Sequence, residues 1–88
     1  MQAIKQPPVQ VDVETRVGAL VSEALARKGL KAVGPEDKLG DAGLSSLDLV
    51  NLMLAVEDAF DLALPEDKMT PENFRTVRAI ETLIASLL

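Results

Sequence analysis

Three segments of the chain carry apolar residues at the spacing of one helix face, and this pattern limits the fold more than any other feature. The first segment begins near Val13 and ends before Gly29. Asp12 is expected to cap it, while Arg27 and Lys28 suit the negative end of the helix dipole. Its apolar face comprises Val17, Leu20, Val21, Ala24 and Leu25. An amphipathic helix is therefore predicted here.

The second periodic segment follows Leu44, where a serine can cap it, and runs to about Phe60. It is apolar on nearly all sides. The face expected to pack inward comprises Leu49, Leu52, Met53, Val56 and Phe60. Leu47, Val50 and Leu54 form a second apolar face, which packing inside one small domain does not explain. The sequence thus predicts a helix with one buried and one spare apolar face.

The third periodic segment is the last helix, for which Thr76 is the predicted cap. Its apolar residues are Val77, Ile80, Leu83, Ile84 and Leu87. Just before it, Thr70 as a cap and Pro71 as the first helical residue predict a short single-turn helix anchored by Phe74.

Together these segments predict an all-α fold, a four-helix bundle with a long first loop over residues 29–45 and one short helix. Pro7 and Pro8 disfavour regular structure, so residues 1–8 are predicted to be a flexible tail. Residues 9–88 are then the single domain. We expect it to fold without any attached group, because the apolar stripes can bury one another, and Phe60 is expected in its core.

The charge distribution restricts the kind of partner. The net charge is −5, and residues 41–88 hold nine acidic and three basic side chains. Nucleic acid is not expected as a partner, because phosphate contacts need clustered Lys and Arg. A basic protein surface suits such a chain better. No apolar run approaches membrane-spanning length and no secretory leader is recognised, so we expect no membrane contact, a cytoplasmic location and a monomer.

Residues that commonly perform catalysis are scarce. The chain has no Cys and no His, which removes thiolate nucleophiles, the usual zinc ligands and the commonest general base. No phosphate-binding glycine loop and no HExxH motif occurs. The sequence therefore predicts neither catalytic residues nor a metal site, and the protein is not expected to be an enzyme.

The segment from Asp41 to Asp48 follows glycines and contains Ser46-Leu47-Asp48 at the start of the second periodic helix. This motif resembles the Asp-Ser-Leu core of the acyl carrier protein family, and the likeness continues to Pro65 and resumes at Thr76. Two residues depart from the family pattern. Ser45 stands where an aspartate is usual, and Asn51 replaces a common glutamate. The segment between Pro65 and Thr76 is also slightly longer than in fatty-acid carriers.

The resemblance implies an acyl-carrier-like bundle with 4′-phosphopantetheine attached covalently to Ser46. The donor would be coenzyme A and the modifying enzyme a phosphopantetheinyl transferase. An acyl- or aminoacyl-loading ligase and downstream acyl-transferring enzymes would be the other partners. The chain would hold an acyl group as a thioester on the arm and deliver it to them.

Ser46 has a simpler alternative role. A serine at a helix start is often only an N-cap, and Ser45 competes with it for attachment, with a local backbone hydrogen bond as its own alternative role. Leu47 and Asp48 set the motif register in favour of Ser46. The positive end of the helix dipole would also suit a phosphodiester at this position.

The spare apolar face predicts a docking surface for these enzymes. Leu47, Val50 and Leu54 lie at steps of three and four on one side of the helix. The predicted acidic rim around them comprises Asp48, Glu57 and Asp58.

Three alternative functions remain open at this point. The chain could be an aminoacyl or peptidyl carrier, an unmodified helical adaptor that binds a partner helix, or a small hydrolase. Modification by a transferase separates the carriers from the adaptor, and activity without added enzymes would favour the hydrolase.

Overall fold

The computed structural model describes residues 13–88, and within this range the chain is helical with no strand. The α-helices are α1 (Val13–Arg27), α2 (Leu39–Ala42), α3 (Ser46–Phe60) and α4 (Val77–Leu87). Two 3-10 turns, η1 (Glu66–Lys68) and η2 (Glu72–Phe74), lie between α3 and α4. The predicted all-α, four-helix class is thus confirmed. The predicted tail over residues 1–8 and the predicted Asp12 cap lie outside the described residues.

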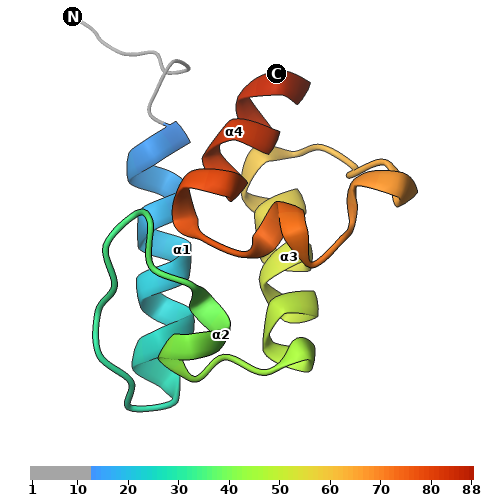
Figure 1. Ribbon diagram of the computed structural model, residues 1–88. Helices are drawn as coiled ribbons and strands as arrows, with labels where there is room; N and C mark the ends of the chain where they lie inside the picture. Colours follow the sequence, from blue (N-terminus) through green and yellow to red (C-terminus); the bar gives the residue numbers. More distant parts are fainter. Residues whose placement is uncertain (1–12) are drawn as a thin grey trace, which may run out of the picture.

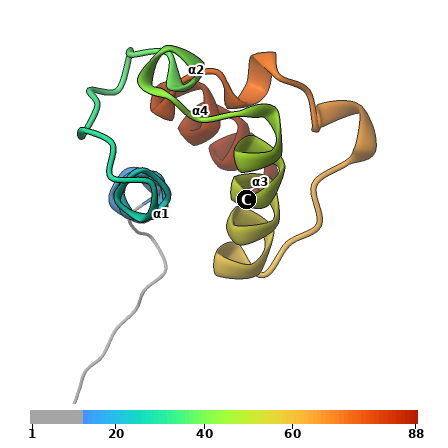
Figure 2. The ribbon, with the colours of Figure 1, turned by 90° about the horizontal axis from the view of Figure 1, so that it is seen from below.

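The three long helices form the bundle, with α1 packed against both α3 and α4 (Figure 1). Figure 2 shows α1 nearly end-on, with the connection after it crossing to α2, while the segment that follows α3 loops out on the opposite side. Gly29, at φ 69°, ends α1 in the left-handed conformation that lets the chain turn away. The long connection then leads through α2 directly to the first turn of α3.

The core lies between α1, α3 and α4 and is entirely apolar among the described residues. Phe74 is fully buried and is its only aromatic member. The expectation that Phe60 would be a core residue is wrong in degree, since its ring is only partly buried. The Arg16 guanidinium lies 4.8 Å from the centre of that ring, so one side of Phe60 faces a cation rather than other apolar groups.

The short α-helix occupies a different place from the one predicted. It is α2, inside the connection that the sequence indicated as a loop. Leu39 is fully buried and its amide donates to the carbonyl of Arg75, so tertiary contacts hold this single turn. Gly43, at φ 117°, closes it in the left-handed region. A four-residue helix offers too little periodicity to be detected from sequence.

The single turn predicted after Thr70 is the 3-10 turn η2. The Thr70 hydroxyl accepts from the amide of Asn73 at 3.3 Å, in the manner of a cap, while Pro71 precedes the turn. Only Arg75 separates η2 from Thr76, whose hydroxyl accepts from the amide of Ala79 at 3.0 Å. Thr76 is extended, at φ −136° and ψ 165°, so the helical backbone is interrupted after Arg75 and η2 cannot continue into an α-helix.

Candidate functional site

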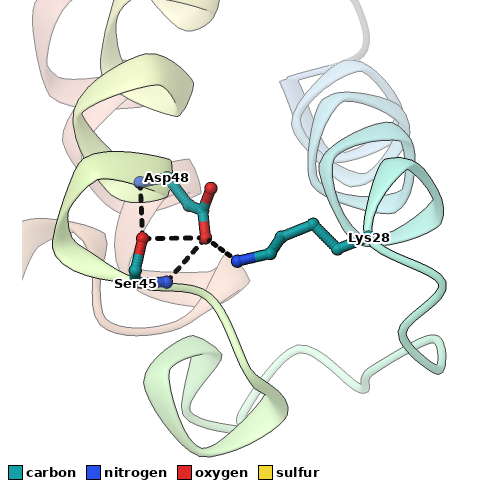
Figure 3. Close-up of polar contacts among 3 residues, drawn as sticks. All are labelled: Lys28, Ser45 and Asp48. Atoms are coloured by element: carbon teal, nitrogen blue, oxygen red, sulfur yellow. Dashed lines mark hydrogen bonds and ion pairs between the residues drawn. The ribbon is translucent and has the colours of Figure 1, made fainter.

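A reciprocal capping box defines the start of α3 (Figure 3). The Ser45 hydroxyl accepts from the amide of Asp48 at 3.1 Å, and the Asp48 carboxylate accepts from the amide of Ser45 at 2.8 Å. The Ser45 hydroxyl also donates to the same carboxylate oxygen at 2.9 Å. Two backbone amides that a helix start leaves without partners are satisfied in this way.

A cation from the residue that directly follows α1 completes this arrangement. The Lys28 ammonium donates to Oδ2 of Asp48 at 2.5 Å, and Figure 3 shows it reaching across from the end of α1. The Lys28 ammonium, followed by the amide and hydroxyl of Ser45, lowers the pKa of Asp48 from 3.8 to about 2. Asp48 is therefore ionised throughout the neutral range, and its charge is locally balanced.

Ser46 is the first residue of α3 and is exposed. Because Ser45 fills the capping role, the alternative that Ser46 is the N-cap is wrong. Its hydroxyl is not required for the helix start and lies on the surface next to the positive end of the helix dipole. A phosphodiester on this oxygen fits the site, since it would meet solvent on one side and the dipole on the other.

The spare apolar face of α3 is exposed. Leu47, Val50 and Leu54 are 68%, 45% and 53% exposed, although each is a large apolar residue. Toward the C-terminal end of α3 the surface has a shallow open hollow. It is lined by Leu54, Glu57 and Asp58 of the helix and by Asp61, Leu62 and Ala63 of the segment that follows. An apolar row with an acidic far end therefore runs along the helix that begins at Ser46.

The three carboxylates of the predicted rim have different surroundings. Asp48 is engaged in the capping box and the Lys28 ion pair. Glu57 is partly buried and its Oε2 accepts from the amide of Leu64 at 2.7 Å, which fixes the turn after α3. Asp58 is exposed. The charge that a partner can reach is thus concentrated toward the C-terminal end of α3.

The sequence predicted for Lys28 only a favourable interaction with the helix dipole, and not its ion pair with Asp48. A signal for its second role exists in the sequence, since a cation ends one helix and an anion begins another. Sequence alone does not show that these two ends meet.

Within residues 13–88 no cluster of three or more potential metal ligands occurs. Across the same residues, no helix combines the length and apolar character needed to cross a bilayer.

A small helical bundle with an exposed serine at the start of a capped, apolar-faced helix has the form of a carrier domain. Residues 15–84 match the protein family described as phosphopantetheine attachment site. The chain belongs to the acyl carrier protein family, whose covalent cofactor is 4′-phosphopantetheine.

Three relatives carry the same type of name. Aminoacyl carrier protein 2 of Bradyrhizobium diazoefficiens is 47% identical over 79 residues, which are 89% of this chain and 89% of that protein. Aminoacyl carrier protein 1 of the same organism is 45% identical over 78 residues, 88% of this chain and 87% of that protein. The aminoacyl carrier protein of Agrobacterium fabrum is 34% identical over 77 residues, 82% of this chain and 93% of that protein.

Solved structures show the same likeness. One is a glycylated carrier protein complexed with Bradyrhizobium japonicum glycine:[carrier protein] ligase, at 46% identity and a TM-score of 0.69. That match covers 82% of this chain and 99% of the other. A second complex, of the ligase with its cognate carrier protein and an analogue of glycyl adenylate, matches at 45% identity and a TM-score of 0.71. It covers 85% of this chain and 99% of the other.

Proposed function

We propose that this chain is an aminoacyl carrier protein, which holds an amino acid as a thioester on a 4′-phosphopantetheine arm at Ser46. The observation that carries the proposal is the identity of 45–47% with two aminoacyl carrier proteins over nearly nine tenths of the chain. The fatty-acid alternative has less support, because Ser45 and the longer segment before Thr76 depart from that pattern.

Attachment needs a serine oxygen that an enzyme can reach. The Ser46 hydroxyl oxygen would attack the pantetheine-bearing phosphorus of coenzyme A. The pyrophosphate bridge then breaks, the adenosine bisphosphate half leaves and the hydroxyl proton passes to a base of the transferase. The exposure of Ser46 and the capping role of Ser45 favour Ser46 over its neighbour. When attached, the arm supplies a terminal thiol that forms the thioester.

The chain itself would bind and present the cargo while its partners perform the chemistry. The described residues contain no cluster of three or more potential metal ligands. The full sequence contains no His and no Cys. A tethered thioester reaches an effective concentration on the order of millimolar once the carrier docks, which is a large gain over a free thiol. The proposed partners are a phosphopantetheinyl transferase, an amino acid:[carrier protein] ligase and an enzyme that accepts the aminoacyl group.

These partners are proposed to dock on α3 through Leu47, Val50 and Leu54. The three side chains are exposed beside Ser46, where an enzyme must approach to receive the arm. Asp58 and the outer side of Glu57 provide an acidic rim at the far end, and Asp48 contributes less because Lys28 balances it. The rim should mainly raise the association rate, whereas the apolar row should set the lifetime of the complex.

Intact mass after incubation with coenzyme A and a broad-specificity transferase tests the attachment. We expect one adduct on the unmodified chain and on Ser45→Ala, and none on Ser46→Ala. An adduct retained by Ser46→Ala would remove the assignment.

The adduct-bearing chain is then incubated with ATP, glycine and the Bradyrhizobium glycine:[carrier protein] ligase. A glycyl adduct supports an aminoacyl carrier, while efficient elongation of fatty chains by a housekeeping synthase would favour the acyl alternative.

Loading kinetics test the docking surface. Leu47→Ala and Leu54→Ala should slow loading through faster dissociation, and a Glu57→Lys, Asp58→Lys double variant should slow association most at low salt. Glu66→Lys, Asp67→Lys in η1 is the matched charge control away from α3. Unchanged loading of all the α3 variants, with helicity intact, would show that partners dock elsewhere.

A further inference from the structure

The carboxylate oxygen Oδ2 of Asp48 receives three donors from two distant parts of the chain. Two come from Ser45, its amide at 2.8 Å and its hydroxyl at 2.9 Å. The third is the Lys28 ammonium at 2.5 Å, twenty residues earlier in the sequence. One atom therefore joins the first turn of α3 to the end of α1.

We propose that Lys28 is a positioning residue for the attachment of 4′-phosphopantetheine, acting through Asp48 to hold Ser46 in a fixed place. This inference rests on the proposed modification of Ser46. Lys28 need not touch the reacting atoms, because its partner Asp48 is bonded to the residue that directly precedes Ser46.

The start of α3 needs such support because packing provides little of it. Among residues 46–51 none is fully buried, and Leu52 is the first residue of α3 that the core covers completely. Helix ends with few buried contacts open easily. Leu44, just before the cap, is buried and anchors the chain on that side. Leu49 packs against the core only partly, and the capping box and Lys28 add the polar contacts that hold the first turn between these two anchors.

The C-terminal end of α3 is also contacted by a cation of α1. Arg16 donates to the carbonyl of Ala59 and lies over the Phe60 ring. Lys28 lies twelve positions after Arg16, and Phe60 lies twelve positions after Asp48, a spacing of about 18 Å for residues in a helix. Arg16 thus contacts the C-terminal end of α3 and Lys28 its N-terminal end. The Lys28 contact is the one next to Ser46.

The physical reason for an effect on rate is the geometry of the transfer. The serine oxygen must lie in line with the bond that breaks, and displacement of a reacting atom by about 1 Å can cost a large factor in rate. A first turn that opens part of the time would present Ser46 in many positions. Lys28 is expected to affect the step within the complex rather than complex formation.

The experiment measures initial rates of adduct formation with a phosphopantetheinyl transferase and coenzyme A over a range of carrier concentrations. Lys28→Met keeps the aliphatic stem and removes the charge, Lys28→Arg keeps the charge, and Lys31→Met is the matched control on the neighbouring loop. We expect Lys28→Met to lower kcat about tenfold with KM changed less than twofold. Lys28→Arg should recover most of the rate, and Lys31→Met should match the unmodified chain.

Two further measurements separate positioning from a general structural role. In an Asp48→Ala background, Lys28→Met should change the rate less than twofold, because the acceptor that links Lys28 to Ser45 is already absent. Without any enzyme, the amide of Leu49, which donates to the carbonyl of Ser45 at 3.0 Å, should exchange faster in Lys28→Met, while the amide of Ile80 in α4 should not.

The inference is overturned if Lys28→Met is modified at the unmodified rate, if only KM rises, or if the Ile80 amide exchanges faster to the same degree. A rise in KM alone would make Lys28 a contact for the transferase, and equal exchange would make it a general stabiliser. Absence of any adduct on the unmodified chain, or an adduct on Ser46→Ala, would instead remove the proposed function and this role with it.

Discussion

Helices α3 and α4 are both apolar and both begin with a hydroxyl cap, yet they use their apolar residues differently. In α4, Val77, Ile80, Leu83 and Ile84 are all buried, and the opposite face carries Arg78, Thr82 and Ser86. In α3, Leu52, Met53 and Val56 are buried while Leu47, Val50 and Leu54 are exposed. The apolar residues of α4 are therefore explained by the core alone, whereas α3 carries a surplus that the fold does not use.

The largest expected effect tests this difference directly. Ile80→Ala should lower the free energy of unfolding by about 2–5 kcal/mol, because it removes fully buried methyl groups and leaves a cavity. Leu54→Ala should change it by less than about 0.5 kcal/mol, since that side chain is half exposed. Urea denaturation measures both. A comparable loss in the two variants would show that the exposed face of α3 is structural.

The approach to each helix also differs. Gly43 precedes α3 at φ 117°, and a Cβ there would lie 2.9 Å from Cδ1 of Leu30, whereas no residue between η2 and α4 has positive φ. Gly43→Ala should therefore cost about 1–3 kcal/mol of stability from backbone strain. Gly18→Ala in α1 is the control, because a Cβ there would meet no atom within 4 Å beyond its own helix backbone, and an alanine should add up to about 1 kcal/mol of stability. Equal thermal shifts in the two variants would contradict the strain argument.

The caps themselves should have similar, smaller effects. Ser45→Ala and Thr76→Ala each remove a hydroxyl that accepts from a backbone amide three residues later, at 3.1 and 3.0 Å. Each change should cost about 1 kcal/mol by urea denaturation. Ser45→Gly, which keeps a favourable cap backbone, should recover most of that loss. A Thr76 cap worth much more than the Ser45 cap would mean that the Asp48 network is not formed in solution.

The smallest expected effect is a dependence on pH that only α3 should show. The pKa of Asp48 in the folded chain is about 2, below its ordinary value of 3.8, so its stabilising contribution is present above about pH 4 and disappears as the pH falls toward 2. The stability deficit of Asp48→Asn should therefore close over that range. The deficit of Thr76→Ala should stay constant, because a hydroxyl does not titrate there. Denaturation series from pH 6 to about pH 2 compare the two.

The long helices could be predicted closely from the sequence because their signals are local. The predicted end of the first helix before Gly29, the start of the second near Ser46 and the Thr76 cap of the last all agree with the structure. The short elements could not be predicted so well. α2 depends on the burial of Leu39 and on the hydrogen bond from its amide to the Arg75 carbonyl, and η2 is ended by the extended backbone of Thr76.

The site was partly predictable for the same reason. The Ser46-Leu47-Asp48 motif was recognised by its resemblance to the acyl carrier protein family, and the spare face of α3 follows from helical spacing, which neighbours within one turn determine. Tertiary structure decided that Lys28 meets Asp48 and that Phe74 rather than Phe60 is the buried aromatic. Each of these outcomes depends on where α1 and α4 pack against α3. Such packing joins residues far apart in the chain, and the free energy of those contacts is not encoded in any one segment.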